Sequence, residues 1–240
     1  MYIEDVYCKK REKVSIKDDF QLLYPYAGVM GLFFPIGRLE NGGTCEFATP
    51  TCLKKCCVKH KGHGTKIGFD RKNEIYQFFL NNSVDKIKSK ILKELRENNC
   101  KIFTWFSSGD CPTFLTSKYY FIIKGLVEKD IIQTGVTRNT ELWKKCQPFS
   151  PYNCKVLLTV EKINDVINFP KKSGLYSIPN YKKGIIDIYN IELNMTYKYG
   201  GCGGRYYEYH IKNKEKEIPH QKLDCTVCWE KKIGCFTLKK

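Results

Sequence analysis

The sequence predicts an α/β fold built on a mainly parallel sheet, either open or curled into a partial (β/α)6 barrel. Short apolar runs bounded by Pro, Gly or Asn recur up to residue 191, and stretches with helical spacing separate them. Strands that alternate with helices imply right-handed crossovers and parallel neighbours. About six strands are expected, fewer than the eight of a closed barrel.

The predicted strands are the apolar runs themselves. The first lies in YAGVMGLFFPIG, is bounded by Gly and Pro, and suits a fully buried strand. KIFTWF, IIQTGV and CKVLLTV have the same character, and GLYSI and GIIDIYNI follow with a short link. By number, the expected strands are residues 28–34, 101–106, 131–136, 154–160, 174–178 and 184–191.

Predicted helices separate these strands. Val84, Ile87, Ile91 and Leu95 recur at helical spacing, so an amphipathic helix is expected from there to about residue 98. Asn139 is expected to cap a short helix in RNTELWKK. The remaining helices are expected at residues 115–127 and 161–168.

The sequence changes character near residue 195. MTYKYGGCGGRYYEYHI alternates like an antiparallel hairpin around a glycine-rich turn, and KNKEKEIPHQK is typical of a polar linker. We therefore expect an α/β domain at residues 1–195 and a cysteine-rich metal-binding module at residues 196–240. Such a module is too short to fold on its own core, so metal would have to hold it together.

The number of cysteines and the expected compartment indicate what the cysteines do. MYIEDVYCKKREK lacks an apolar segment, and no run of about 18 apolar residues occurs, so we expect a soluble, cytoplasmic protein. Thiols stay reduced in that compartment, and thirteen is an odd number, so metal binding or catalysis is favoured over a disulfide framework. Most of the scattered cysteines are expected to be small buried hydrophobes: Cys8, Cys100, Cys111, Cys146 and Cys154.

Cys45, Cys52 and Cys56 form the first cysteine group, with the spacing C-x6-C-x3-C and Cys57 adjacent. The group directly follows the first strand, which places it at the edge where parallel α/β folds build their sites. Three thiolates on a four-iron cluster would leave one iron open for a substrate or cofactor.

Two alternatives stay open for this group. Cys52, Cys56, His60 and His63 give C-x3-C-x3-H-x2-H, a mixed ligand set that zinc accepts. The other alternative is that the cysteines bind nothing. Residues 51–72 carry seven basic side chains, including Lys54, Lys55 and Lys59, against Asp70 alone, and cations beside cysteines stabilise the thiolates that ligate metal. The metal ligands expected in this group are Cys45, Cys52 and Cys56.

The second group lies in the tail and consists of Cys202, Cys225, Cys228 and Cys235. Its last three members have the spacing C-x2-C-x6-C. Four thiolates form a closed shell, as in a structural zinc site or a fully ligated cluster. The spacing does not distinguish the two.

Polar residues follow two predicted strands at their C-terminal ends. They are Ser107, Ser108, Gly109 and Asp110 after KIFTWF, and Thr137, Arg138 and Asn139 after IIQTGV. In a parallel sheet both loops face the same mouth as the cysteine loop. There they can bind a cofactor's amino, ribose or carboxylate groups. The alternatives are a helix cap for Asp110 and a surface salt bridge, with Glu141, for Arg138.

The formal net charge of +16 makes a polyanion the expected partner, and nucleic acid is the natural one; no membrane partner is expected. Tyr206, Tyr207 and Tyr209, with Arg205 beside them, suit a strand of nucleic acid or, equally, the half-buried face of a hairpin.

The order of motifs resembles a bacteriophage and mobile-element family, the gene-product-eighty-eight-like proteins. The likeness covers most of residues 29–235 and is carried by FFPIGRLENGGTCEFATPTCLKKCC, SSGD, TGVTRNTELW and CTVCWEKKIGC. Cys57 departs from it, because relatives look aromatic at that position. The resemblance implies a bacterial or archaeal host cell and a phage-encoded chain, and by itself it implies no activity.

The arrangement also resembles, more remotely, the radical S-adenosylmethionine superfamily, in which a partial parallel barrel places three cysteines after its first strand. That resemblance implies that Cys45, Cys52 and Cys56 ligate a 4Fe–4S cluster and that Asp110 and Arg138 help to position S-adenosylmethionine. It also implies an auxiliary cluster in the tail. The usual superfamily spacing is C-x3-C-x2-C, narrower than the spacing here.

Three hypotheses follow. The leading one is an iron-sulfur, radical S-adenosylmethionine-like enzyme that acts on a nucleic acid or nucleotide. The alternative is a zinc-stabilised nucleic-acid-binding protein without catalysis, whose affinity comes from its charge. A zinc-dependent nuclease or hydrolase using Asp110 is the third, although the chain has no HExxH or comparable motif.

Overall fold

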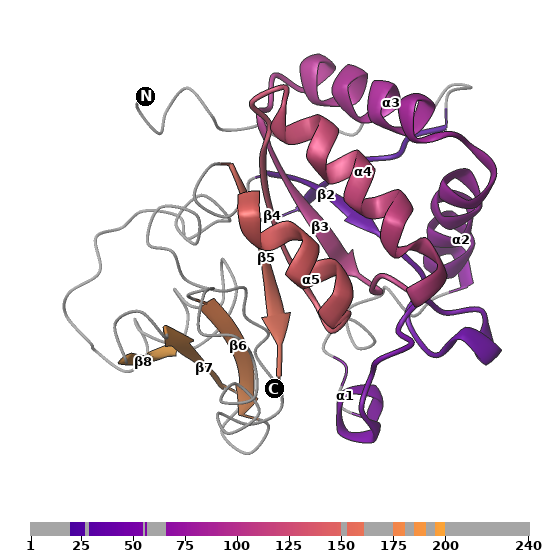
Figure 1. Ribbon diagram of the computed structural model, residues 1–240. Coiled ribbons are helices and arrows are strands. Elements are labelled where there is room, and N and C mark those ends of the chain that lie inside the picture. Colours follow the sequence, from indigo (N-terminus) through magenta and orange to yellow (C-terminus); the bar gives the residue numbers. More distant parts are fainter. Residues whose placement is uncertain are drawn as a thin grey trace.

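Figure 1 shows the chain as a computed structural model. The tail beyond residue 199, with the second cysteine group, lies outside the described residues, as do the expected helix at residues 161–168 and His60 and His63. The structure describes residues 20–26, 29–54, 56, 66–149, 153–160, 175–180, 185–190 and 195–199, the last three segments by their backbone alone.

The described strands form one sheet in which the spatial order follows the order in the sequence. Strands β2 to β6 are parallel neighbours, whereas β1, β7 and β8 pair antiparallel. The predicted α/β class with a mainly parallel, unclosed sheet is confirmed. The strands are β1 (Tyr24–Tyr26), β2 (Val29–Phe33), β3 (Ile102–Ser108), β4 (Ile132–Thr137), β5 (Cys154–Thr159), β6 (Leu175–Asn180), β7 (Ile185–Asn190) and β8 (Met195–Tyr199).

The helices are α1 (Pro50–Lys54), α2 (Lys66–Asn81), α3 (Val84–Glu97), α4 (Thr116–Val127) and α5 (Thr140–Cys146). The last three were predicted, and α5 has the expected cap, because Asn139 Oδ1 accepts a hydrogen bond from Leu142 N at 2.9 Å. Helix α2 is absent from the sequence-based prediction. Its buried face combines Ile75 and Phe79 with a lysine, so the apolar periodicity is interrupted. No helix in the described part of the chain is both long and apolar enough to cross a membrane.

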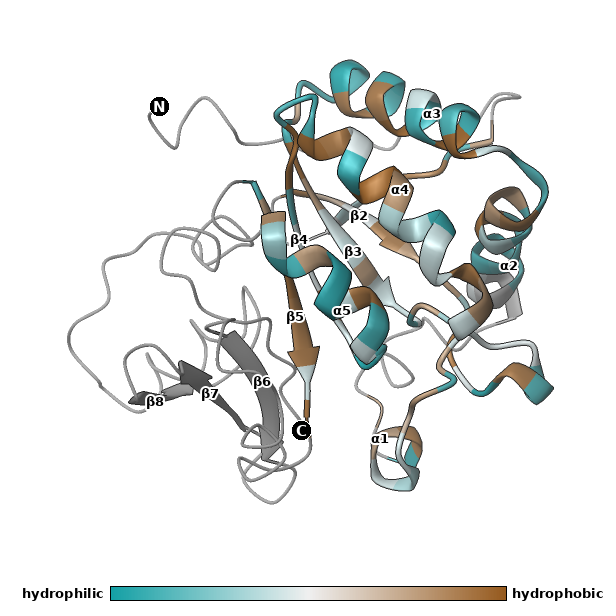
Figure 2. Cartoon of the chain, in the orientation of Figure 1, coloured by the Kyte–Doolittle hydropathy of each residue, from teal (hydrophilic) through white to brown (hydrophobic). Residues whose placement is uncertain are grey.

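Helices α3, α4 and α5 cover the same face of the sheet (Figure 1). This follows from the strand order, because each right-handed crossover advances by one strand in the same direction. Hydrophobic and hydrophilic residues alternate around α3 (Figure 2), as expected for a helix with one face on the core.

Aromatic side chains fill the space between the sheet and the helices. Trp105 of β3 lies edge-on to Tyr119 of α4, with ring centroids 5.7 Å apart, and Phe79 of α2 stacks on Tyr119 at 5.3 Å. Trp105 Nε1 donates to Gln133 Oε1 at 2.9 Å, and Gln133 Nε2 donates to Ile123 O at 3.1 Å. Both buried polar groups are thereby satisfied, and the sheet is joined firmly to α4.

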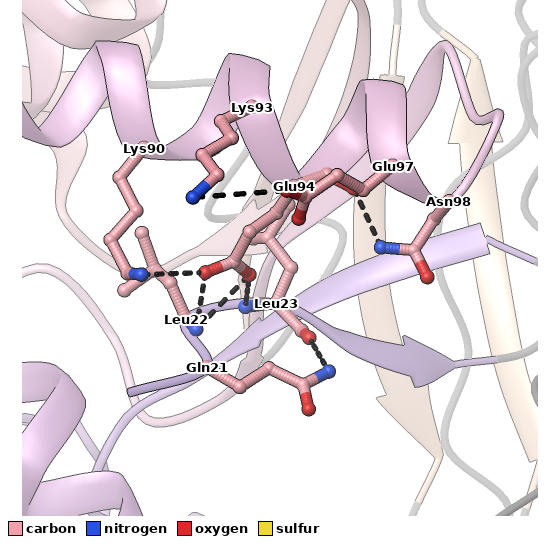
Figure 3. A network of polar contacts seen from close by, with 8 residues as sticks. All are labelled: Gln21, Leu22, Leu23, Lys90, Lys93, Glu94, Glu97 and Asn98. Atoms are coloured by element: carbon pink, nitrogen blue, oxygen red, sulfur yellow. Dashed lines mark hydrogen bonds and ion pairs between the residues drawn. The ribbon is translucent and has the colours of Figure 1, made fainter. Parts of the chain in front are cut away.

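Two charged side chains anchor segments of the backbone. Glu94 of α3 accepts hydrogen bonds from Leu22 N (2.9 Å) and Leu23 N (2.7 Å), and Lys90 Nζ lies 3.1 Å from the same carboxylate (Figure 3). Lys118 Nζ donates to three carbonyl oxygens at the end of α2, where a cation is favoured by the helix dipole. These acceptors are Phe79 O at 2.8 Å, and Leu80 O and Asn82 O at 3.1 Å.

Candidate functional site

Three loops meet where β2, β3 and β4 end. Phe34 N donates to Ser108 O at 2.9 Å, and Ser108 Oγ donates to Phe34 O at 2.8 Å. Asp110 N donates to Thr44 Oγ1 at 3.0 Å, and that hydroxyl donates to Pro35 O at 3.0 Å. The segment that leads into the cysteine loop is therefore fastened to the SSGD loop, at the edge where parallel strands end together.

Gly109 makes this close approach feasible. Its φ is +75°, in the left-handed region that favours glycine. A Cβ at this position would lie 2.5 Å from Thr44 Oγ1 and 2.7 Å from Phe34 Cβ. The role shown for Gly109 is thus to let the two loops touch.

The end of β3 also departs from regular strand geometry. Phe106 has a φ of +52°, and the pairing of β2 with β3 shifts register between Gly31 and Phe33. Within the described residues, Ser107 Oγ is buried without a hydrogen-bond partner. Positive φ at a bulky residue and a register shift are features that gather at functional sites. The hydroxyl of Ser107 is a polar group that a ligand can use.

Asp110 joins the β3 loop to the β4 loop. Its Oδ1 accepts hydrogen bonds from Thr137 Oγ1 (2.5 Å) and Cys111 N (2.7 Å), and its Oδ2 accepts one from Arg138 N (2.9 Å). Burial raises the pKa of Asp110 to about 6, against the opposing effect of these hydrogen bonds and, last, of the Arg138 charge. The carboxyl therefore titrates near neutrality. It is not the helix cap considered above, because its carboxylate binds Cys111 N and the β4 loop, and α4 has no side-chain cap.

Arg138 and Asn139 complete the β4 loop. Arg138 is partly buried, and Glu141, the salt-bridge partner considered for it, lies 3.7 Å from Lys145. Asn139 Nδ2 donates to Thr116 Oγ1 at 2.8 Å and to a backbone carbonyl of the β3 loop at 3.1 Å. Asn139 therefore links the N-terminal ends of α4 and α5 to the site.

The cysteine loop folds over this edge. Cys45 N donates to Gly37 O at 2.8 Å, and Cys52 N donates to Thr49 Oγ1 at 3.0 Å at the start of α1. Cys45, Cys52 and Cys56 are partly buried and are not disulfide-bonded. Burial, then the Asp110 carboxylate, and more weakly Cys52 and Cys56 raise the pKa of Cys45 to about 12. Cys45 is thus within electrostatic reach of Asp110, Cys52 and Cys56.

Lys72 is a site residue that the sequence indicated only as one of the seven basic side chains in residues 51–72. It lies on the buried face of α2 and is only 4% exposed. Burial lowers the pKa of its ammonium group, whereas Cys56 and Cys45 act in the opposite direction. The signal in the sequence is its spacing. Lys72 stands three, four and seven residues before Ile75, Tyr76 and Phe79, as residues on one face of a helix do. Of the lysines that the sequence suggested, Lys54 is exposed, and Lys55 and Lys59 lie outside the described residues.

Glu46 is a residue that sequence reasoning missed. Its Oε2 accepts a hydrogen bond from Thr113 N at 2.7 Å, and its Oε1 accepts one from Thr113 Oγ1 at 3.0 Å. The residue next to Cys45 is therefore tied to the loop before α4. Phe47 and Phe114, the residues that follow each partner of this tether, are 38% and 61% exposed.

The other described cysteines are not part of the site's surface. Cys111, Cys146 and Cys154 are buried and free, as expected for small hydrophobes, while Cys100 is disulfide-bonded, which the compartment argument did not predict. Burial raises the pKa of Cys111, and a hydrogen bond with Cys146 is the main cause that raises the pKa of Cys154.

The thiol groups of the cysteine loop are of the chemical type that binds soft metal ions. Among the described residues, no three His, Cys, Asp or Glu side chains already stand at metal-binding distances. Cys45 and Cys56 nevertheless lie within electrostatic reach of the buried Lys72, and thiolates are the ligands that iron-sulfur clusters and zinc select. Because burial keeps the Cys45 thiol protonated, metal binding there would release a proton.

Comparison with known proteins brought no relative to light: no family model, curated protein or solved structure matches the chain.

Proposed function

We propose that this chain is an iron-sulfur protein of radical S-adenosylmethionine-like type that acts on a nucleic acid or nucleotide. The observation that carries the proposal is the place of the loop with Cys45, Cys52 and Cys56, which follows β2 and is fastened through Thr44 to the β3 loop at the C-terminal edge of an unclosed, mainly parallel sheet. In a fold of this kind that edge is where cofactors and substrates bind.

Each residue at the edge has a distinct part in the proposal. Cys45, Cys52 and Cys56 would hold a four-iron cluster and leave one iron open to S-adenosylmethionine. When bound, the cluster supplies an electron to that cofactor. Asp110 orients the β4 loop through Arg138 N, and the guanidinium of Arg138 would bind a carboxylate group of the cofactor.

Two further groups support cofactor binding at the SSGD loop. Gly109 permits the close contact with Thr44, and Ser108 Oγ holds the end of β2, so both act by shaping the loop. The buried hydroxyl of Ser107 suits a polar group of the cofactor. Ser108, Gly109, Asp110 and Arg138 remain the predicted cofactor-binding residues.

The choice of a nucleic acid or nucleotide as substrate rests on charge and exposed rings. The chain carries +16, which attracts polyanions. Phe47 and Phe114 flank the Glu46–Thr113 tether and expose aromatic surface on which a base can stack.

Anaerobic purification followed by iron, sulfide and zinc analysis tests the proposal. We expect iron and sulfide, with S-adenosylmethionine binding detectable by calorimetry. Cys45→Ala should lose the first cluster and Cys228→Ala the predicted second one in the tail. Cys146→Ala, a change of a buried cysteine in α5, is the matched control and should keep both. Colourless protein with zinc and no sulfide would refute the iron-sulfur assignment.

The alternative function is a zinc-stabilised nucleic-acid-binding protein without catalysis. It is favoured by the same charge and exposed rings, since neither requires a reactive metal. Zinc at both cysteine groups, nucleic-acid affinity that falls steeply with salt, and no S-adenosylmethionine binding would establish it instead.

A further inference from the structure

The exposed large apolar side chains in the described part of the chain all lie on two segments. Leu39 (37%) and Phe47 (38%) lie between β2 and α1, in the segment that carries Cys45. Phe114 (61%) lies in the turn before α4, and Phe121 (55%) lies on α4 itself. Single exposed apolar residues are common on protein surfaces, whereas a group of them marks a binding surface.

The two segments are fastened to each other. Glu46 Oε2 accepts a hydrogen bond from Thr113 N at 2.7 Å, and Glu46 Oε1 accepts one from Thr113 Oγ1 at 3.0 Å. Phe47 directly follows the acceptor in the sequence, and Phe114 directly follows the donor. Both exposed rings therefore belong to residues beside this contact, at the edge of the sheet where the cysteine loop lies.

The exposed face of α4 continues from the same contact. Its exposed positions are spaced by three, four and three residues, as positions on one side of a helix are: Phe114, Ser117, Phe121 and Lys124. At a rise of about 1.5 Å per residue, Phe114 and Phe121 are about 10 Å apart along the helix. One base is too small to cover both rings, so this face suits a polymer better than a free nucleotide.

Further rings and cations lie beside Phe121. Tyr120 contacts Phe121, with ring centroids 5.3 Å apart, and stacks on Phe149 at 6.1 Å. Lys145 Nζ of α5 lies 5.6 Å from the centroid of the Tyr120 ring. Helices α4 and α5 lie side by side (Figure 1), and together they carry four lysines but a single acidic residue, Glu141. The rings therefore stand on a basic surface.

Rings and cations in this arrangement fit one class of partner. Single-stranded nucleic acids offer the faces of their bases and a phosphate chain, and proteins bind them with aromatic side chains on a basic surface. A duplex keeps the faces of its bases inside the stack. A second copy of this chain would bring the same lysines to the interface, where like charges repel.

We propose that Phe47, Phe114 and Phe121 form a track that binds single-stranded nucleic acid, with bases stacked on the rings and phosphates facing the lysines of α4 and α5. The track leads to the edge where the cysteine loop meets the SSGD loop. The inference rests on the nucleic-acid substrate of the proposed function and is independent of any metal.

The test measures the affinity of the full chain for labelled single-stranded DNA and RNA of about 16 nucleotides by fluorescence anisotropy. We expect Phe114→Ala and Phe121→Ala each to weaken binding about tenfold, because each removes one stacking ring. Phe121→Leu should weaken binding as much, since it keeps apolar surface but loses the ring, whereas Phe121→Trp should bind at least as tightly as wild type. Lys124→Ala should lower the salt dependence of the affinity.

Leu39→Ala is the matched control, because Leu39 is an exposed apolar residue without a ring, and it should bind like wild type. Thermal unfolding of the same samples shows that each variant is folded. Phe114→Ala and Phe121→Ala proteins that bind single strands as well as wild type would overturn the track and leave the proposed substrate standing.

Two other results would also overturn the track. One is duplex DNA bound as tightly as the single strand. The other is a wild-type dimer in light scattering that Phe121→Asp dissociates, which would make this face an interface between two copies. Wild-type protein that binds no oligonucleotide would refute both the track and a nucleic-acid substrate, while the iron and sulfide analysis would still decide the metal assignment.

Discussion

Glu94 and Asp110 are equally buried, each 6% exposed, but their surroundings differ. Glu94 accepts hydrogen bonds from two successive backbone N–H groups and has the Lys90 ammonium 3.1 Å away. Asp110 accepts hydrogen bonds from one hydroxyl and two backbone N–H groups, all of them neutral donors. The Glu94 carboxylate binds the backbone just before β1, next to a lysine. The Asp110 carboxylate joins two loops at the candidate site.

The difference shows that the depth of burial does not by itself determine what a carboxylate does. With a cation in contact, Glu94 is suited to holding backbone. With neutral donors alone in contact, burial dominates at Asp110 and raises its pKa to about 6. The contacts of Glu94 therefore stabilise the fold, whereas burial of the ionised Asp110 carboxylate lowers the free energy of unfolding.

The largest expected effect is the loss of the glycine that positions Asp110. Gly109→Ala should lower the free energy of unfolding by about 4 kcal/mol, because left-handed strain adds to clashes with Thr44 and Phe34. Urea denaturation measures the change. Gly37→Ala is the control: its φ of +108° is also strained, but nothing lies within 4 Å of the added Cβ, so a cost of about 1–2 kcal/mol is expected. Equal costs would show that the contact between the loops is dispensable.

Removal of Glu94 should have the next largest effect. Glu94→Ala leaves the N–H groups of Leu22 and Leu23 without their acceptor, and we expect a loss of about 3 kcal/mol. Glu97→Ala, one turn further along α3, is the matched control. Glu97 lies on the exposed face, 3.8 Å from Lys93, and its removal should cost about 0.5 kcal/mol or less. A small loss for Glu94→Ala in thermal unfolding would contradict the role of Glu94 as a clasp.

Asp110 should give the protein an unusual pH dependence. Because its pKa is raised from 3.8 to about 6, the folded state binds the proton more tightly than the unfolded state does. Its contribution to stability is therefore most favourable below pH 4 and falls as the pH rises towards about 6, by up to about 3 kcal/mol.

Denaturation series from pH 4 to pH 7 would show this slope in the difference between wild type and Asp110→Asn. Thr137→Val should shift the slope to higher pH, because the Thr137 hydroxyl opposes the rise in pKa. Wild type and Asp110→Asn curves that run parallel would mean that Asp110 keeps an ordinary pKa.

The smallest expected effect concerns a cation held by carbonyl oxygens. Lys118→Met removes the donor shared by Phe79 O, Leu80 O and Asn82 O, and we expect a cost of about 2 kcal/mol. Lys124→Met, an exposed change on the same helix, should cost less than about 0.5 kcal/mol. If the two variants unfold at the same denaturant concentration, the end of α2 does not depend on Lys118.

Periodicity predicted those elements whose patterns were uninterrupted. The apolar residues of α3 and α4 recur at helical spacing, and Asn139 indicated the start of α5 as its N-cap. Helix α2 was missed because Lys72 lies among its apolar residues. The alternation of strands and helices predicted that the SSGD, TRN and cysteine loops would share an edge, and the contacts between Thr44, Asp110 and Arg138 N show this for the described residues.

The sequence alone determined the α/β class, the parallel central strands and the edge at which the cysteines lie, because period and chain order are local properties. Only the tertiary structure decided the chemical environment at that edge. Burial and partners depend on residues far apart in the chain: Glu94 is 72 residues from Leu22, and Asp110 is 27 from Thr137. The same holds for Lys72, which the sequence shows as one basic residue among several and which only the packing of α2 buries.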